Sequence, residues 1–339
     1  MTKDRPVVTF ALLSYNQEGY IGAAVDAALA QNYSPLEVII SDDSSTDGTY
    51  EEILRILSQY NGPHEVIARR TLANRGSMLH VSEVAALARG KLLVLAAGDD
   101  ISKWNRTSVL VSQWQASGAW GLCSRFDRID QSGKLLETSV LPAVLSGRGF
   151  KDFFYEEEGP VRIVHGCSSA YDIRAFEYLK LGPQDYILAE DGTMSVLLNL
   201  IGKPIVNLDD SLVYYRESPS SLTNNRVRDK LTFAKIVEDE RRIERFAGAQ
   251  ANRCRLFLGM NDYLGAAQTR RMKVGAVEAE LARQMIRASW GETAFIDRVS
   301  FAMRDRRSTW ALPRLFGLNL FYLAKWLSRR FSKDREESR

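Results

Sequence analysis

The sequence predicts an α/β fold: a Rossmann-like, mostly parallel sheet flanked by helices, followed by a helical C-terminal extension. Three observations support this prediction. Apolar runs and helical segments alternate four times within the first hundred residues, polar clusters follow three of the four runs, and strand signals stop near residue 226. Right-handed crossovers arrange such an alternation as parallel strands with helices on both faces. The polar clusters then gather at one rim of the sheet, where open α/β sheets bind ligands.

The strands of this alternation are short apolar runs that end in turn-forming residues. The sequence predicts strands at residues 7–13, 36–41, 65–68 and 92–97. The last of these runs is apolar enough to be buried on both faces of a sheet. The segments between the runs are rich in alanine or carry apolar residues at helical spacing, and they predict helices at residues 21–31, 50–60, 77–88 and 104–117.

The second half of the chain is less regular. We expect, in order, a strand, a hairpin turn, a strand-like segment, two helices and two short strands, at residues 120–129, 130–133, 164–171, 174–179, 190–201, 204–208 and 211–215. The composition then becomes charged and helical. We therefore expect an α/β domain over residues 1–225 and a helical region over residues 226–339, with amphipathic helices at residues 230–246, 277–290 and 313–331.

Composition and charge narrow the class of protein. The 339 residues are 45% apolar and 26% charged, which is ordinary for a soluble chain. Residues 304–339 carry ten Lys/Arg and four Asp/Glu, so this tail holds a charge of +6 while the whole chain carries +3. A near-neutral body with a basic tail does not match a nucleic-acid-binding protein, whose basic patch would lie on the folded domain. It fits contact with anionic lipid better.

The helix predicted at residues 313–331 combines aromatic and aliphatic residues with flanking Arg and Lys. It is too short and too interrupted to span a bilayer, and it fits an interfacial helix with basic anchors. The alternative is a helix that packs on the catalytic body with its basic residues in solvent. The N-terminus lacks a signal-peptide core and the three cysteines are widely spaced, so we expect a cytoplasmic protein with peripheral contact to the inner face of the plasma membrane.

Several motifs of phosphate and acyl chemistry are absent from the sequence. There is no GxxxxGK, no GxGxxG after the first predicted strand, and no GxSxG. Their absence argues against P-loop nucleotide hydrolysis, dinucleotide redox chemistry and acyl hydrolysis.

A pair of carboxylates, Asp99 and Asp100, follows the apolar run at residues 92–97. Carboxylates at the end of a parallel strand meet solvent, so they can hold a divalent cation, Mn or Mg, through oxygen ligands. Such a cation would act as a Lewis acid on the diphosphate of a nucleotide sugar. The alternative is a structural loop in which Asp100 caps the helix that follows.

Two more acidic clusters complete the candidate chemistry. Asp42, or its neighbour Asp43, follows the second predicted strand and could accept a hydrogen bond from a pyrimidine N–H. Glu190 and Asp191 follow a turn and open a helix, and they are candidates for the general base that an acceptor hydroxyl needs.

The order of these motifs resembles that of the family-2 inverting glycosyltransferases, which have the GT-A fold. The matching segments are SYN, SDDSSTDGT, NRG, VLAAGDDI and AEDGT, between residue 7 and about residue 225. The resemblance implies a nucleotide-sugar donor (UDP or dTDP), a divalent cation, and Asp191 as catalytic base with Glu190 before it. The donor-binding residues that it implies are Ser14, Tyr15, Asn16, Asp42, Asp43, Asp47, Gly76 and Asp99.

One position departs from the family pattern. The acidic motif of the family reads Asp-x-Asp-Asp, and here its first position is Ala97. Asp99 then occupies the position that contacts metal in the family, with Asp100 beside it. The lost carboxylate predicts weaker cation binding, or a ribose contact supplied elsewhere. The QxxRW signature of processive synthases is also absent, which favours a single-addition enzyme.

Other residues are weaker candidates. His165 and Gly166 lie where related enzymes often bind the sugar or the acceptor, and the alternative for His165 is a hydrogen-bonded core histidine. Arg216 could reach the diphosphate, because a guanidinium binds phosphate in a bidentate manner. Residues 218–225 could close over the donor as a lid.

Together these observations and the resemblance predict an inverting glycosyltransferase that adds one sugar to a hydroxyl of a glycan or a polyprenyl-linked saccharide. The resemblance implies a role in bacterial surface-polysaccharide synthesis. Two alternatives stay open. A metal-dependent nucleotidyltransferase should show a glycine-rich basic loop after the first strand, and residues 14–19 contain no Lys or Arg. A non-catalytic binding or scaffold protein would fit the loss at Ala97 but not the intact pair Glu190 and Asp191.

Overall fold

The computed structural model describes residues 5–140, 161–182, 185–188, 190–217, 233–264, 271–290, 292–293 and 296–299. The chain divides into two compact units. The first comprises Met1–Asn225 with Leu256–Val277, and the second comprises Arg226–Arg255 with Glu278–Arg339. The predicted terminal helix at residues 313–331 and the predicted lid at residues 218–225 lie outside the described residues, and the division into functional domains at residue 225 stays a prediction.

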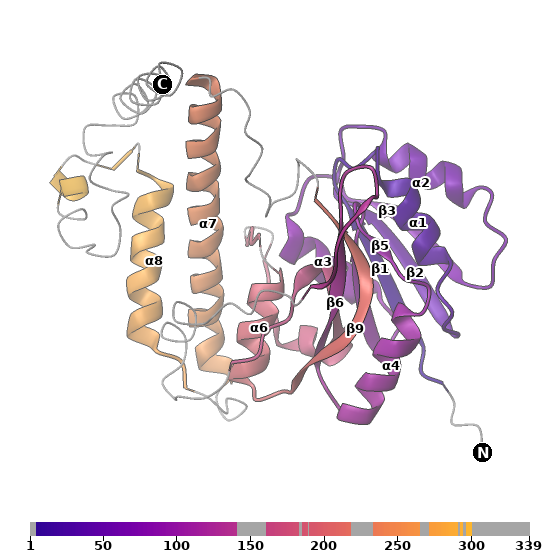
Figure 1. Ribbon diagram of the computed structural model, residues 1–339. Helices are drawn as coiled ribbons and strands as arrows, with labels where there is room; N and C mark the ends of the chain where they lie inside the picture. Colours follow the sequence, from indigo (N-terminus) through magenta and orange to yellow (C-terminus); the bar gives the residue numbers. More distant parts are fainter. Residues whose placement is uncertain are drawn as a thin grey trace, which may run out of the picture. The chain divides into compact units, whose positions relative to one another are not determined.

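Within the described residues, nine strands of the first unit form one sheet in the order β3-β2-β1-β4-β8-β6-β9-β5, with β7 paired to β6 (Figure 1). Its first half is parallel, as the sequence predicts, because each strand returns through a helix. The four parallel strands are β1 (Val8–Ser14), β2 (Leu36–Asp42), β3 (Glu65–Arg70) and β4 (Leu92–Ala97).

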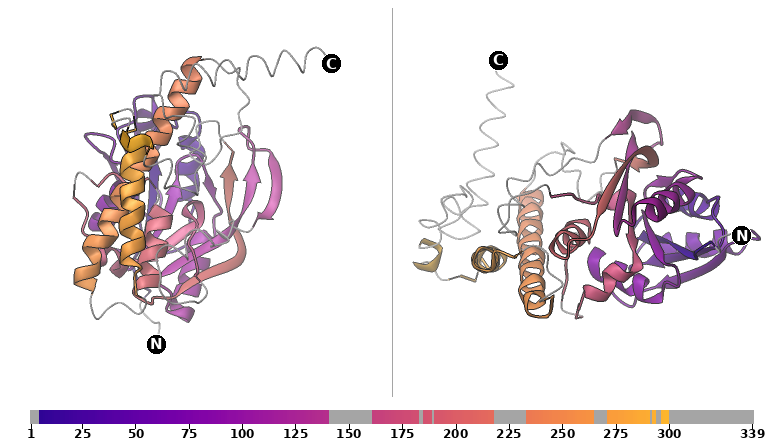
Figure 2. Two further views of the ribbon diagram at one scale, coloured as in Figure 1. Left: turned by 90° about the vertical axis from the view of Figure 1, so that its left-hand side faces the viewer. Right: turned by 90° about the horizontal axis from the view of Figure 1, so that it is seen from below.

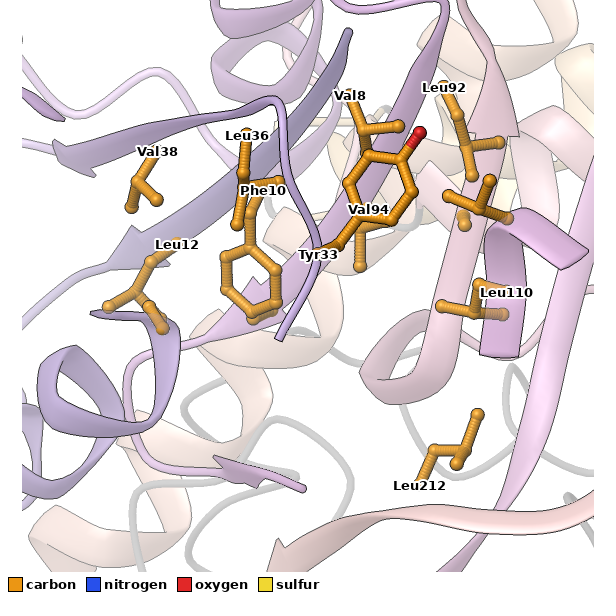
Figure 3. Packing of buried hydrophobic residues seen from close by; sticks show 14 of the residues in the cluster. Val8, Phe10, Leu12, Tyr33, Leu36, Val38, Leu92, Val94, Leu110 and Leu212 are labelled. Atoms are coloured by element: carbon orange, nitrogen blue, oxygen red, sulfur yellow. The ribbon is translucent and has the colours of Figure 1, made fainter. Parts of the chain in front are cut away.

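Helices cover both faces of this half-sheet (Figures 1 and 2). On one face, alternate residues of β1, β2 and β4 pack against α1 (Ile21–Leu29), α2 (Thr49–Leu57) and α4 (Arg106–Ser117). Figure 3 shows this core around the β1 side chains Val8, Phe10 and Leu12. On the other face lie α3 (Ser77–Leu87) and α6 (Glu190–Leu200), which contact each other.

The second half of the sheet is mixed in direction. β8 (Ser169–Asp172) is antiparallel to both β4 and β6 (Gly121–Ile129), and β7 (Leu135–Val140) returns from β6 as the predicted hairpin. β5 (Ile101–Ser102) is a two-residue strand that pairs with β9. Only the end of the strand-like segment predicted at residues 164–171 is a strand. The residues before it form a 3₁₀ turn, η1 (Gly166–Ser168), and a second 3₁₀ helix, η2 (Ile173–Tyr178), follows it.

One predicted break in the sheet is wrong. The segments 204–208 and 211–215 form a single strand, β9 (Ile205–Arg216), which runs parallel to β6. Leu208 pairs with Ser124, and the next pair is Ser211 with Arg125, so Asp209 and Asp210 form an exposed bulge. Two adjacent aspartates look like a turn in the sequence, but a bulge accommodates them without ending the strand.

Beyond the sheet, the structure describes α7 (Phe233–Leu264) and α8 (Val274–Ala288). α7 extends well past the predicted end at residue 246, and α8 corresponds to the predicted helix at residues 277–290. Within the second unit, the two helices lie side by side (Figures 1 and 2). Among the described residues, no helix is long and apolar enough to cross a membrane.

Candidate active site

The ends of β1, β2 and β4 meet at one rim of the sheet, as the sequence predicts. Ser14 is paired with Asp42 in the β1–β2 register. The Gly98 N–H donates to the carbonyl of Leu13 at 2.8 Å, and the Asp43 N–H donates to the carbonyl of Ser14 at 2.8 Å. The polar segments after these three strands therefore lie together.

Asp42 is fully buried in the first acidic loop. Its carboxylate accepts hydrogen bonds from the Ser45 N–H at 2.9 Å, from the Ser45 hydroxyl, and from the Ser14 hydroxyl at 3.3 Å. The Arg70 Nε lies 3.4 Å from the same carboxylate. Asp42 thus shapes the loop from within, and a direct contact with a pyrimidine base stays a prediction.

Asp43 anchors a different loop, the one that precedes α3. It is 4% exposed, and its carboxylate accepts from the Thr71 hydroxyl at 3.1 Å, the Arg75 N–H at 2.8 Å and the Gly76 N–H at 3.0 Å. Gly76 has φ 73°, and a Cβ added to it would lie 2.6 Å from the ring of Tyr186. Glycine is therefore required where this loop passes the segment that leads to Glu190.

The SYN segment is tied to the same acidic loop. Asn16 adopts φ 51°, its N–H donates to the Ser45 hydroxyl at 2.8 Å, and its side-chain oxygen accepts from the Thr46 N–H at 2.8 Å. Tyr15 beside it is exposed, so its ring is available to a ligand at the rim.

Asp47 closes the acidic loop at the start of α2. Its carboxylate accepts hydrogen bonds from the N–H and hydroxyl of Thr49 and from the Glu18 N–H at 3.2 Å. Burial tends to raise the pKa of Asp47, but these hydrogen bonds outweigh it and lower the pKa below its usual value. Asp47 is thus an ionised cap that connects this loop to the segment before α1.

The second acidic loop follows β4. Asp100 is 4% exposed, and one of its oxygens accepts from the Arg216 N–H at 2.9 Å. Burial raises the pKa of Asp100 well above its usual range, and the charge of Asp99 raises it further, whereas Arg216 and Arg106 act in the opposite direction. The two adjacent carboxylates therefore repel each other at the rim.

This pair fits a divalent cation. Among the described residues, no group of three or more His, Cys, Asp or Glu side chains is arranged to bind a metal. Two carboxylates are nevertheless what Mg²⁺ commonly takes from a protein when substrate phosphates and water complete its coordination shell. A cation would also relieve the repulsion between Asp99 and Asp100.

Arg216 lies beneath this acidic loop and is only 5% exposed. Its guanidinium donates to the carbonyls of Asp99 at 2.9 Å, Asp130 at 3.2 Å and Gln131 at 2.9 Å, and it lies 5.0 Å from the ring centre of Tyr20. In this arrangement Arg216 supports the loop, and direct contact with a diphosphate stays a prediction.

The third acidic cluster opens α6. Asp191 accepts hydrogen bonds from the Gly166 N–H at 3.2 Å and from the Gly192 N–H at 2.6 Å. A Cβ on Gly166 would lie 2.7 Å from a carboxylate oxygen of Glu190 and 3.4 Å from one of Asp191. The structure therefore brings Gly166 against both predicted catalytic carboxylates. Burial and the charge of Asp191 raise the pKa of Glu190 to about 8, so Glu190 is protonated at neutral pH.

His165 lies one residue before this contact. Its ring stacks on Phe126 with 5.3 Å between ring centres, and its Nδ1 lies 3.2 Å from the Cys167 sulfur. Burial lowers the pKa of His165, while the charge of Asp191 opposes that shift. A neutral, stacked imidazole suits both a packing role and contact with a sugar, so its predicted role stays open.

Hydrogen bonds connect the first acidic cluster to the third, and the second and third clusters both act on one thiol. The Ser77 hydroxyl donates to the Leu188 carbonyl at 2.7 Å, and the Met78 N–H donates to the Ile187 carbonyl at 3.2 Å, so the loop held by Asp43 also holds the approach to Glu190. On the other side, burial and then the charges of Asp100 and Asp191 raise the pKa of Cys167 well above its usual value. One thiol therefore lies within the electric field of both carboxylates.

The structure also contains a buried cation that sequence analysis missed. Arg106 is the first residue of α4 and is completely buried. Its guanidinium donates to the carbonyls of Leu95 at 2.6 Å and Ser169 at 3.3 Å, and to the Ser102 hydroxyl at 2.9 Å. Nothing in the local sequence separates it from an ordinary surface arginine of a helix, because its partners come from three separate segments.

Comparison with known proteins identifies the family. The sequence profile described as glycosyl transferase family 2 matches residues 9–179, which is half of the chain. The chain belongs to glycosyl transferase family 2. The matched segment contains the first two acidic clusters of this family-2 chain and ends before Glu190 and Asp191.

Curated relatives match this family-2 chain over part of their lengths. An uncharacterized glycosyltransferase of Nostoc sp. is 23% identical over 62% of this chain and 64% of that protein. An uncharacterized protein of Mycobacterium tuberculosis is 43% identical over 26% of this chain and 25% of that protein. The Escherichia coli UDP-Glc:alpha-D-GlcNAc-diphosphoundecaprenol beta-1,3-glucosyltransferase WfaP is 29% identical over 30% of this chain and 38% of that protein. The chain thus spans less than two thirds of each of these relatives.

Solved structures confirm the predicted fold class, which is α/β of the GT-A type. Staphylococcus aureus TarS in complex with UDP-GlcNAc aligns with a TM-score of 0.50 at 14% identity, covering 90% of this chain and 77% of that chain. GalNAc-T7 with UDP, GalNAc and Mn²⁺ aligns with a TM-score of 0.52 at 16% identity, covering 84% of this chain and 58% of that chain. At such identities the likeness concerns the fold.

Proposed function

We propose that this family-2 protein is an inverting glycosyltransferase that moves one sugar from a nucleotide-sugar donor to a hydroxyl group of an acceptor. The observation that carries the proposal is the contact of Gly166 with Asp191 and Glu190. An ionisable carboxylate is oriented there by two backbone N–H groups, and the neighbouring carboxylate has its pKa raised to about 8. A carboxyl group whose pKa is raised beside a second carboxylate is typical of acid–base sites.

In the proposed reaction, Asp191 accepts the proton of the acceptor hydroxyl. The acceptor oxygen forms a bond to the anomeric carbon of the donor sugar, and the bond from that carbon to the diphosphate oxygen breaks. The attack comes from the face opposite the leaving group, so the configuration inverts. Glu190 holds its proton at neutral pH, so Asp191, which the Gly166 and Gly192 N–H groups orient, is proposed as the base.

Asp99 and Asp100 would hold a divalent cation, Mn or Mg, beside the diphosphate. When bound, the cation supplies Lewis-acid stabilisation of the charge that develops on the leaving nucleoside diphosphate. The Mn²⁺ in the structure of GalNAc-T7, a chain of the same fold, supports this assignment. Arg216 and Arg106 position the acidic loop in this proposal.

The donor-binding residues are proposed to be the SYN segment and the first acidic loop. Exposed Tyr15 offers a ring for stacking a base, and Asp42, Asp43 and Asp47 fix the loops around it. The UDP and UDP-GlcNAc of the GT-A structures favour a uridine donor, with dTDP-sugars as the closest alternative.

The acceptor is proposed to be a glycan or a polyprenyl-linked saccharide of bacterial surface-polysaccharide synthesis. The name of WfaP describes transfer to a diphosphoundecaprenol-linked sugar, which supports this class of acceptor. A cytoplasmic enzyme in peripheral contact with the inner face of the membrane would meet such acceptors. The basic tail at residues 304–339 suits that location.

The proposal is tested by release of nucleoside diphosphate from a panel of UDP-, dTDP- and GDP-sugars with and without Mn²⁺. We expect Mn²⁺-stimulated release from at least one donor and loss of that release in Asp191→Asn. If no donor is turned over, or if Asp191→Asn is as active as the parent, the protein is a binding module of this fold. Incorporation of the nucleotide into a product, with pyrophosphate released, would instead indicate a nucleotidyltransferase.

A further inference from the structure

The inference concerns the point at which β4 and β8 separate. These antiparallel strands pair at Leu92 with Asp172, Leu93 with Tyr171 and Val94 with Ala170, and the pairing stops there. The next pair in this register would be Leu95 with Ser169. Their carbonyls both accept hydrogen bonds from the guanidinium of Arg106.

The guanidinium of Arg106 therefore lies between the two strands at the position of the next residue pair. From the point where the pairing ends, the chain of β4 continues through Gly98 to the acidic pair Asp99 and Asp100. The other strand is preceded by η1, which contains Gly166, whose N–H donates to Asp191. Arg106 thus lies where the chain segment that leads to Asp99 and Asp100 separates from the turn whose Gly166 contacts Asp191.

The environment of Arg106 is unusual for a residue that only stabilises the core. It is completely buried, and no carboxylate of the described residues forms an ion pair with it. Its Nε has no hydrogen-bond partner in the described part of the chain. Burying a cation without an ion pair is costly, so the hydrogen bonds to the two carbonyls and the hydroxyl must offset that cost.

The planar geometry of the side chain explains why an arginine is present. A guanidinium presents several N–H donors in a fixed fork, whereas an ammonium is a compact point charge on a flexible stem. Arg106 can therefore hold two carbonyls and the Ser102 hydroxyl at set separations. It also supplies a positive charge close to Asp100.

We propose that Arg106 is a positioning residue that sets the separation between the acidic pair Asp99–Asp100 and the Gly166–Asp191 contact. This inference rests on the proposed function, because it concerns alignment of the leaving group with the base. Misplacing reacting groups by about 1 Å can cost roughly a hundredfold in rate while each binding group stays intact. Loss of the Arg106 guanidinium should therefore lower kcat more than it weakens donor binding.

The test uses Arg106→Lys in the full chain, with Arg174→Lys as the matched control. Arg174 is an exposed arginine near the other end of β8. Its Nη2 lies 2.7 Å from Oδ2 of Asp172. For the wild type and both variants we would measure kcat for nucleotide release, and the Kd for UDP with Mn²⁺ by calorimetry, which does not depend on turnover.

We expect Arg106→Lys to lower kcat about tenfold or more, with the Kd for UDP and Mn²⁺ within about threefold of the wild type. Arg174→Lys should match the wild type in both. If Arg106→Lys keeps its kcat within threefold, or if its Kd weakens as much as its kcat falls, the positioning role is wrong. A wild type without turnover on any donor would refute the proposed function itself, so the two failures are distinct.

Should Arg106→Lys fail to fold, Ser102→Ala decides. It removes the hydroxyl partner of the guanidinium and leaves both carbonyl contacts. We expect its kcat to fall about threefold or more, with the melting temperature and the Kd for UDP unchanged. An unchanged kcat in Ser102→Ala would overturn the inference.

Discussion

Two groups of carboxylates at the rim differ in how deeply the protein buries them. Asp42 and Asp43 are buried, and each accepts at least three hydrogen bonds from the loops around it. Glu190 and Asp191 are less buried, and the pKa of Glu190 is raised to about 8. The first group shapes the site, and the second retains the capacity to exchange a proton.

This difference predicts which substitutions damage folding and which damage chemistry. Replacing a buried carboxylate that accepts several hydrogen bonds lowers the free energy of unfolding, because buried donors lose their acceptor. Replacing a carboxylate that accepts a proton in the reaction lowers the rate far more than it lowers the free energy of unfolding. Each prediction below tests one side of this comparison.

The largest effect is expected for Asp191→Asn. The amide keeps the shape of the side chain but cannot accept the proton, so kcat for nucleotide release should fall by about a thousandfold. The free energy of unfolding, measured in urea, should fall by about 1 kcal/mol, less than in Asp43→Asn, because the Asp191 oxygens that accept from the Gly166 and Gly192 N–H groups are less buried. A large loss of stability with activity retained would reverse the assignment of the two groups.

Asp43→Asn should give the opposite pattern. One side-chain oxygen becomes an NH₂ that faces the N–H group of either Arg75 or Gly76, so a buried donor loses its acceptor. We expect about 2 kcal/mol of lost stability in urea unfolding. The donor KM should rise, while kcat at saturating donor should fall far less than in Asp191→Asn. Unchanged stability would show that the loop does not depend on this carboxylate.

Gly76→Ala probes the link between the two groups. Its positive φ and the Tyr186 ring 2.6 Å from an added Cβ should together cost about 1–2 kcal/mol. Gly19→Ala is the matched control, because an added Cβ there meets no atom within 4 Å. Equal unfolding midpoints for the two variants would contradict the close packing of the loop on the segment before Glu190.

The proton on Glu190 predicts how stability depends on pH. In the folded protein the pKa of Glu190 is about 8, whereas in the unfolded chain its pKa is near the usual value of 4.5. Between those values the folded state holds more protons, so the stabilising contribution is present below the lower pKa and is lost as pH rises through the higher one. Glu190→Gln should flatten this dependence. Melting curves at pH 5.5 and 8.5 that shift equally in both proteins would contradict it.

The smallest effect is expected at Ala97, on the cation side of the site. Ala97→Asp restores the carboxylate that the family pattern has there, so the affinity for Mn²⁺ should rise by about three- to tenfold. Electron paramagnetic resonance of free Mn²⁺ measures this without turnover. Ala97→Asn is the control of equal shape without charge, and equal affinities in the two variants would exclude an electrostatic cause.

The parallel half of the fold could be predicted because its signals are local. Apolar runs, helical spacing and turn residues each lie within one segment, and crossover handedness arranges them. The bulge at Asp209 and Asp210 could not be predicted, because a turn and a bulge have the same residues and only pairing with β6 separates them. The β4–β8 pairing likewise ends where a side chain from another element, Arg106, donates to the carbonyls of both strands.

The sequence could nominate the residues of the candidate site but not their partners. Motif order located all three acidic clusters, and the structure brings their loops together through contacts such as Ser77 with Leu188. The burial of Asp42 by Ser14, Ser45 and Arg70, and the use of the Arg216 guanidinium on backbone carbonyls, depend on contacts between distant segments. Such contacts leave no pattern in a single sequence.

The most direct measurement of the central claim is an anomalous difference map from crystals soaked with Mn²⁺ and UDP. The account predicts a manganese peak bound by Asp99 or Asp100 and by the diphosphate, with Asp191 close enough for one sugar and one acceptor hydroxyl to fit between them. A manganese ion bound elsewhere, or a UDP whose diphosphate points away from Asp191, would contradict it.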